Sequence, residues 1–418
     1  MEERPAVAGA VKRLPLRWLL SIAVWGPGLL VMLADTDPGN IVTAAQSGSK
    51  WGYHLLPLLV ALIPLLYMVQ ELTVRLGIFT GRGHGELIRE KFGPGWAWFA
   101  VLGLTVAAVG SMVTEFTGVA GVGEMYGVSR SITLPSAAAV LMAIVLSGSY
   151  QRMERATLLI GLFELAFFVV AGVSHPDFAK IARSVTDLPL GNHEFLFLAA
   201  ALIGASFNPW MIFYQQSAVA DKRLTPEQYP AARWDTAIGA VLTQLLTGAV
   251  LIAAATTLGG KHPVPLDSVG DVSRALTPIL GREAGRLIFS IGVLGAAMVA
   301  AIVASQAFSW GIGEAAGYRR SLESRAKPAL WFHVVYVVCV AGSALLVWAS
   351  TDLVWLTVAA QVVNTFMLPM LIGFLVVLAR RSLPDAQRLQ GGYLAVLLAA
   401  SAATCIIGFV GGLSGLWG

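Results

Sequence analysis

The chain has 418 residues, of which 56% are hydrophobic and only 12% charged, and its mean hydropathy is +0.73. The charged share is about half that of an average soluble domain, so a soluble globular protein is excluded and a polytopic membrane protein is predicted. The length accommodates roughly eleven spans of about 20 to 25 residues with short connections. The net charge of +4 is small, and we expect no nucleic-acid partner.

The chain opens with a basic stretch, residues 1–17, which we expect to be a cytoplasmic tail. It runs into an apolar segment without a small-residue cleavage site, so a removable signal peptide is not predicted. Residues 18–418 are then expected to form a single transmembrane domain. Apolar windows place helices near 18–49 (broken), 53–79, 96–126, 132–149, 156–174, 194–219 (broken), 232–258, 284–316, 330–350, 353–380 and 391–414.

The first span is interrupted by Asp37-Pro38-Gly39-Asn40, two residues after a second carboxylate, Asp35. A charged side chain at the bilayer centre costs at least about 2.5 to 3.5 kcal/mol, so an intramembrane carboxylate predicts an ion site. Proline removes a backbone donor, and we expect Gly39 to permit unusual backbone angles, so the helix should open here. Opening frees carbonyl oxygens at the negative end of the first half-helix, where a cation would be stabilised.

The sixth span has a matching interruption at 204–209, and Pro209 corresponds in position to Pro38. Because each half contains five spans, an odd number, the two halves enter from opposite sides, as in transporters built from an inverted repeat. We therefore predict an all-α fold of five plus five helices, about 18–174 and 194–380, with an eleventh helix at about 391–414.

Lysine and arginine are distributed unequally between alternate connections. The N-terminal side holds 20 of the 28 basic residues. Since positively charged loops stay on the cytoplasmic side, we expect a cytoplasmic N-terminus, an external C-terminus and a location in the cell membrane.

The residues beside the two breaks supply oxygen ligands. These are the Asp37 carboxylate, the amide oxygens of Asn40 and Asn208, and the freed carbonyl oxygen of Ala205. Hard oxygen ligands favour Mg²⁺, Ca²⁺ or Mn²⁺ over Cu⁺ or Zn²⁺. Because Mg²⁺ sheds water reluctantly, we expect it to bind partly hydrated in a roomy polar cavity.

Around these residues the chain resembles the NRAMP family of divalent metal transporters, whose hallmark is Asp-Pro-Gly-Asn in the first helix. The resemblance continues through 70–77, 80–83 and 361–363 and covers nearly the whole chain. It implies a LeuT-like fold with alternating access and a metal held by Asp37, Asn40, the Ala205 carbonyl and position 208. It also implies that Gln361 joins in an occluded state.

Departures from the family pattern change the expected metal. Where the transition-metal transporters have Met-Pro-His, this chain has Asn208-Pro209-Trp210, so a soft thioether becomes an amide oxygen and a protonatable imidazole becomes an indole. One of two carboxylates in the third helix is also replaced, since Glu115 is present but Gly118 takes the second position. The pattern is similar to the NRAMP-related magnesium transporters, which carry Mg²⁺ and Mn²⁺ without evident proton coupling.

Several residues have competing interpretations. Asp35 is expected to face away from Asp37, and Asn40 and Asn208 could instead cap the half-helices. We interpret Glu115 as a cavity-facing carboxylate that attracts the cation, with a glutamic acid buried between helices as the alternative. Glu164 and Glu314 are read as packing or gating groups. Gln361 and Asn364 lie on one helix face, so they fit either a cavity wall or interhelical hydrogen bonds.

The predicted function is import of Mg²⁺ and also Mn²⁺ by a secondary transporter, with the metal ion as substrate and no cofactor. One alternative is a proton-coupled NRAMP-type Mn²⁺ or Fe²⁺ symporter. A sodium-coupled organic-solute symporter is disfavoured because the acidic break would repel a carboxylate substrate. A membrane-embedded enzyme is disfavoured because no HExxH motif or serine–histidine pair occurs inside the spans. The oligomeric state stays open, and a monomer is compatible with the sequence.

Overall fold

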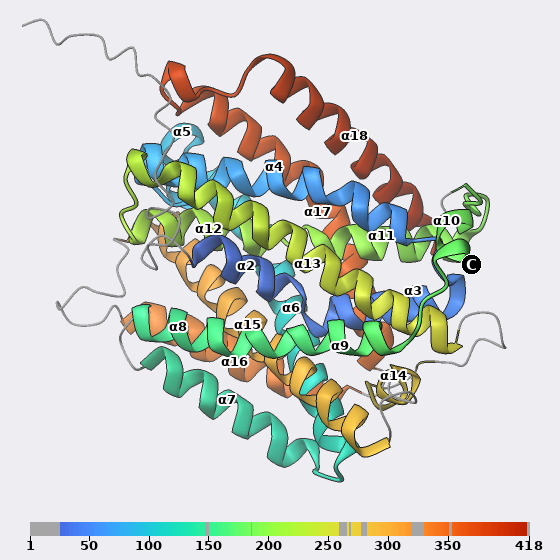
Figure 1. Ribbon diagram of the computed structural model, residues 1–418. Helices are drawn as coiled ribbons and strands as arrows, with labels where there is room; N and C mark the ends of the chain where they lie inside the picture. The colour runs from blue at the N-terminus through green and yellow to red at the C-terminus, as the bar shows by residue number, and fades with distance from the viewer. Residues whose placement is uncertain are drawn as a thin grey trace, which may run out of the picture.

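The computed structural model describes residues 26–146, 150–184, 186–258, 266, 269–276, 282–318, 330–350 and 353–415. The predicted cytoplasmic tail at 1–17 and the start of the first predicted helix lie outside the described residues. Within the described ranges the regular structure is entirely helical (Figure 1).

The helices of the first half of the chain are α2 Pro27–Asp35, α3 Pro38–Trp51, α4 Leu56–Thr80, α5 His84–Phe92, α6 Pro94–Met125, α7 Arg130–Leu146, α8 Tyr150–Gly161, the 3₁₀ turn η1 Leu162–Leu165, α9 Ala166–Val173 and α10 Phe178–Ser184. Those of the second half are α11 His193–Ser206, α12 Pro209–Asp221, η2 Pro226–Gln228, α13 Tyr229–Leu258, α14 Val269–Leu276, α15 Arg282–Ala316, α16 Leu330–Ala349, α17 Leu353–Arg381, η3 Asp385–Gln387 and α18 Gly391–Ser414. Among the described residues, eight helical segments are long and apolar enough to cross a membrane, and two shorter apolar helices accompany them.

Both predicted interruptions are present, but each is shorter than the sequence pattern suggested. Only Thr36 and Asp37 separate α2 from α3, and only Phe207 and Asn208 separate α11 from α12. Each proline opens the following half-helix, where its missing N–H is not needed. The expectation that Gly39 supplies unusual backbone angles is wrong, because Gly39 lies within α3 and is not among the glycines with positive φ.

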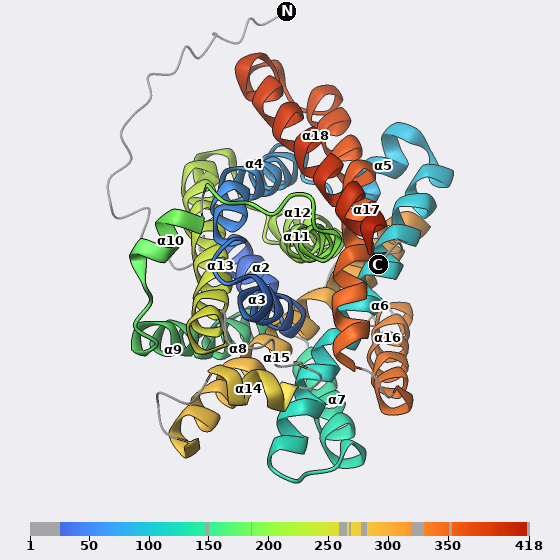
Figure 2. The ribbon, with the colours of Figure 1, turned by 90° about the vertical axis from the view of Figure 1, so that its right-hand side faces the viewer.

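The second broken helix runs through the middle of the bundle. Viewed along the helices, α11 and α12 lie near the centre, with α2, α3, α4, α13 and α17 around them (Figure 2). Helix α11 packs against α3, α17 and α18, whereas α12 packs against α2, α4 and α15. The four ends that meet at the two breaks are therefore enclosed by protein, which is where non-helical backbone is tolerated at membrane depth.

The sequence patterns did not predict the connecting helices α5, α10 and α14, which are only seven to nine residues long. Helix α5 is anchored by Glu314 of α15, whose Oε2 accepts a hydrogen bond from the Gly85 N–H at 2.9 Å. The neighbouring His84 is buried, and its Nδ1 lies 2.9 Å from the Gln216 Oε1. Burial lowers the pKa of His84 to about 4, so this imidazole is neutral at pH 7.

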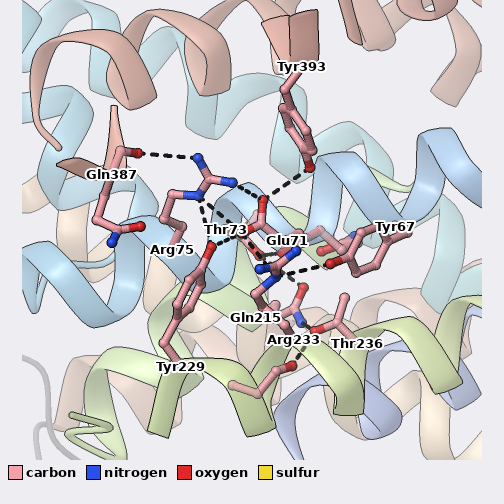
Figure 3. A network of polar contacts seen from close by, with 12 residues as sticks. Tyr67, Glu71, Thr73, Arg75, Gln215, Tyr229, Arg233, Thr236, Gln387 and Tyr393 are labelled. Carbon is pink, nitrogen blue, oxygen red and sulfur yellow. Dashed lines mark hydrogen bonds and ion pairs between the residues drawn. The ribbon is translucent and has the colours of Figure 1, made fainter. Parts of the chain in front are cut away.

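A buried carboxylate connects α4 to two later helices near the end of the bundle that carries α5 (Figure 3). Glu71 is fully buried and accepts hydrogen bonds from Arg75 at 2.6 and 3.0 Å. It also accepts hydrogen bonds from the hydroxyl groups of Tyr229 on α13 and Tyr393 on α18. Arg75 in turn donates to the carbonyl oxygen of Gln387, at 3.2 Å. One charge thus organises contacts among α4, α13 and the segment that leads into α18.

We expect Glu71→Ala to destabilise the protein strongly, because it leaves the largely buried Arg75 without its counter-ion. Removing one partner of a buried ion pair typically costs about 3 to 5 kcal/mol. Glu90→Ala is the matched control, since Glu90 is exposed and its ion pairs, with Arg82 at 3.8 Å and Lys91 at 3.1 Å, lie at the surface; its effect should stay below about 1 kcal/mol. Thermal unfolding in detergent measures both, and equal midpoints for the two variants would contradict this role of Glu71.

Candidate metal site

Asp37 stands at the N-terminal cap of α3 and uses one carboxyl oxygen for the backbone. Its Oδ1 accepts a hydrogen bond from the Asn40 N–H at 2.6 Å, which stabilises the first turn of the helix. Its Oδ2 is buried and has no hydrogen-bond partner among the described residues. The alternative in which the asparagines cap the half-helices is wrong for α3, because Asp37 performs that role. At α12, Asn208 occupies the cap position but makes no side-chain capping bond.

The amide groups of the two asparagines hold the ends of the breaks. The Asn40 Nδ2 donates to the Asp35 carbonyl oxygen at 3.0 Å, and its Oδ1 is buried without a partner. The Asn208 Nδ2 donates to the Ala205 carbonyl oxygen at 3.0 Å, so these two residues are in direct contact. Each amide N–H therefore forms a hydrogen bond across its own break, and the amide oxygen remains available to another partner.

Helix α17 closes one side of the site with the amides of Gln361 and Asn364. The Asn364 Nδ2 donates to the Asn208 Oδ1 and, at 3.1 Å, to the Gln361 Oε1. The Gln361 side chain in turn interacts with the Asp37 carboxyl group. The two open interpretations of this polar stripe are therefore compatible, since the interhelical hydrogen bonds themselves line the site.

Two glycines, one in each broken helix, allow α17 to pack closely against α3 and α11. A Cβ atom on Gly39 would lie 2.1 Å from the Gln361 Nε2, and one on Gly204 would lie 1.8 Å from the Gln361 carbonyl oxygen. Both distances are too short for real contacts: a side chain on Gly39 would have to displace the movable end of Gln361, whereas one on Gly204 would meet the backbone of α17. The glycine of the Asp-Pro-Gly-Asn motif thus serves close approach rather than backbone bending.

Glu115 of α6 reaches the site from a third direction. It is 1% exposed, its Oε1 accepts a hydrogen bond from Ser111 at 3.0 Å, and its Oε2 has no partner among the described residues. Its side chain interacts with Asp37. One turn further on, a Cβ atom on Gly118 would lie 2.6 Å from the Pro38 Cγ, so α6 packs directly onto the start of α3 and leaves no room for a second carboxylate.

The expectation that Asp35 faces away from the site is wrong. Asp35 is fully buried, and its carboxyl oxygens lie 3.5 Å from the Asn208 Nδ2 and 3.5 Å from the Thr243 hydroxyl. The expectation assumed one continuous helix between Asp35 and Asp37. The break between them changes the chain direction, so helical spacing no longer applies.

The candidate ligand residues are buried in this structure. The predicted ligand side chains of Asp37, Asn40, Asn208 and Gln361 are at most 1% exposed. At the end that carries α5, the start of α2 is held by Asp235 of α13, which accepts the Gly28 N–H at 2.8 Å. An ion pair of 2.6 Å between Glu154 and Lys222 lies beside it.

The donor atoms suit a hard cation. The unpartnered oxygens of Asp37, Asn40 and Glu115 are buried acceptors, and leaving such groups unsatisfied is costly, so they fit a positively charged ligand. No group of three or more His, Cys, Asp or Glu side chains in the described ranges is arranged to hold a metal ion. The site therefore depends on amide and backbone oxygens, which are the ligands of Mg²⁺, Ca²⁺ and Mn²⁺.

No sequence pattern predicted the hydroxyl and amide groups of α13 that contact the two breaks. Thr243 lies 3.0 Å from the Thr36 hydroxyl, and the Gln244 Nε2 donates to the Ser206 hydroxyl at 2.9 Å. Adjacent polar residues inside a long apolar helix were the available signal, but a single hydroxyl in a span is commonly satisfied by its own backbone.

Two broken helices that meet at a buried polar site, within an all-helical bundle, define a membrane transporter with a LeuT-like fold. The chain belongs to the natural resistance-associated macrophage protein-like (Nramp) family, whose model matches residues 28–413.

Named relatives and solved structures agree with this membership. The chain is 27% identical over 294 residues to the divalent metal cation transporter MntH of Klebsiella pneumoniae, covering 69% of this chain and 71% of the relative. It is 32% identical over 302 residues to MntH of Ralstonia nicotianae, covering 68% and 66%. Its fold is similar to the manganese transporter of Eremococcus coleocola, with a TM-score of 0.77 and 16% identity over 96% of this chain and 88% of that one. A sodium-coupled sialic acid symporter is also similar, with a TM-score of 0.61 and 14% identity over the same shares.

Gly39 and Gly204 both lie against Gln361, but we expect different effects when each is replaced by alanine. In Gly39→Ala the new methyl group meets the movable end of the Gln361 side chain, so we expect normal folding but weaker Mn²⁺ binding. In Gly204→Ala it meets the backbone of α17, so we expect a lower thermal midpoint. Thermal unfolding and Mn²⁺ titration of both proteins test this, and unchanged Mn²⁺ affinity in Gly39→Ala would show that Gln361 does not contribute.

Proposed function

We propose that the protein transports divalent cations, Mg²⁺ and also Mn²⁺, by alternating access and without proton coupling. In this proposal it resides in the cell membrane with a cytoplasmic N-terminus and an external C-terminus. Its named relatives are divalent metal or manganese transporters, which supports the cation class.

The observation that carries the proposal is the chemistry of the donor set. Asp37, Asn40, Asn208 and Ala205 would bind the metal through oxygen atoms, and Gln361 would add an amide oxygen. Sulfur selects softer metals, whereas a carboxylate with amides and carbonyls suits Mg²⁺ and Mn²⁺ alike. Mg²⁺ prefers six oxygen ligands at about 2.0 to 2.1 Å and retains waters, so few protein ligands suffice.

Two residues support the absence of proton coupling. Trp210 is fully buried beside the second break and carries an indole, which does not titrate. Gly118 lies against Pro38 and offers no carboxylate for a proton route. The proton-coupled Mn²⁺ or Fe²⁺ symporter would need other groups for both roles.

Uptake into liposomes tests the proposal. Purified protein should carry both Mg²⁺ and Mn²⁺ into vesicles while the interior pH stays constant and while a sodium gradient has no effect. Asp37→Asn is the matched negative control, because asparagine also caps helices well and removes only the charge. It should fold normally and transport neither ion.

Two results would contradict the proposal. Failure of the wild-type protein to carry Mg²⁺ while it carries Mn²⁺ would favour the transition-metal alternative. Acidification of the vesicle interior that depends on the metal gradient would establish proton coupling.

A further inference from the structure

Glu164 is a buried carboxylate that the metal site described above does not use. It is 0% exposed, and neither of its carboxyl oxygens has a hydrogen-bond partner among the described residues. Buried ionisable groups are usually paired, and an acidic residue inside a transmembrane segment indicates a functional site. A bound ligand would supply the partner that the Glu164 carboxyl group lacks.

A local change in helix geometry places Glu164 at the level of the first break. The residue lies in η1, the 3₁₀ turn between α8 and α9, and a 3₁₀ segment in the middle of a helix often marks a functional position. Close contacts fix this turn on both sides. A Cβ atom on Gly161 would lie 2.9 Å from Leu33 of α2, and one on Gly295 of α15 would lie 3.0 Å from the Phe163 Cβ.

The polar groups that interact electrostatically with Glu164 belong to the first break. The charged groups that act on it are the carboxylates of Asp35 and Asp37, and its neutral polar neighbour is the Thr36 hydroxyl. Thr36 lies 3.0 Å from the Thr243 hydroxyl, which itself lies 3.5 Å from the Asp35 Oδ2. The carboxyl groups of Glu164 and Asp35 and the hydroxyl groups of Thr36 and Thr243 thus lie beside the central site, between α2, η1 and α13.

More carboxyl groups lie around the break than one divalent cation can balance if they are ionised. Asp35, Asp37, Glu115 and Glu164 are all buried at this level, and one Mg²⁺ or Mn²⁺ neutralises only two of them. We propose that Glu164 and Asp35, with the Thr36 and Thr243 hydroxyls, hold a second divalent cation beside the ion bound by Asp37. Oxygen-only ligands again match a hard metal ion.

A second position for the ion would assist release. An ion held by a buried carboxylate leaves slowly unless a neighbouring site accepts it or a following ion displaces it, as in multi-ion channels. This inference rests on the proposed transport of divalent cations, but it concerns the number of bound ions rather than the choice of metal.

Counting bound Mn²⁺ by electron paramagnetic resonance tests the inference on the full-length protein in detergent. Free Mn²⁺ gives a sharp signal that is lost on binding, so a titration yields the number of ions bound. We expect the wild-type protein to bind two ions, one tightly and one more weakly. Glu164→Gln should bind one ion tightly, and Asp37→Asn should lose the tight ion.

A matched control separates this effect from the general loss of a buried acid. Glu314→Gln removes a carboxylate that is 2% exposed but accepts hydrogen bonds from Ser217 at 2.6 Å and from Gly85. This variant should still bind two Mn²⁺ ions. Thr243→Val gives a second test near Glu164, because it removes only a hydroxyl group, and it should weaken the second ion.

The inference is overturned if the wild-type protein binds a single Mn²⁺ ion, or if Glu164→Gln still binds two. A single ion would mean that Glu164 is protonated and structural. Because the assay uses Mn²⁺, failure of the protein to carry Mg²⁺ would overturn the proposed selectivity and leave the ion count unaffected. The two proposals can therefore fail separately.

Discussion

The constraint on which this structure depends is the need to satisfy backbone and side-chain polar groups where two helices break inside a membrane. Each break removes helical hydrogen bonds at a depth where water and lipid cannot replace them. Asn40 and Asn208 compensate by donating to the carbonyl oxygens of Asp35 and Ala205. The oxygens that remain unpartnered, on Asp37 and Asn40, become the strongest candidates for binding a cation.

Long apolar windows allowed much of the fold to be predicted. Helix α18 covers the same residues as its predicted window, and α4 and α17 differ from theirs by only a few residues at the ends. The breaks were found because proline within an apolar run signals a helix end. Their width was overestimated, because the sequence does not show whether proline disrupts a helix or starts the next one. Short connecting helices such as α5 were missed because they depend on contacts with distant residues, here Glu314.

The sequence predicted which polar residues lie beside the two breaks, but it did not predict how they are arranged. The motif and its partner triplet identified Asp37, Asn40 and Asn208, and these lie within one connected group of polar side chains. Packing between helices far apart in sequence determines the remaining features. It sets the position of Asp35, the close approach of α17 to Gly39 and Gly204, and the contribution of Thr243. No local pattern encodes such packing, because it depends on how the two halves meet.

We propose that the residue at position 208 decides which metal is carried. Competitive uptake of Mg²⁺ and Cd²⁺ into liposomes by wild-type protein, Asn208→Met and Asn208→Leu tests it most directly. Methionine supplies a soft sulfur ligand, whereas leucine has a similar size without one. The account predicts that Asn208→Met gains Cd²⁺ transport and loses Mg²⁺ transport, while Asn208→Leu only loses Mg²⁺ transport. Unchanged metal preference in Asn208→Met would contradict it.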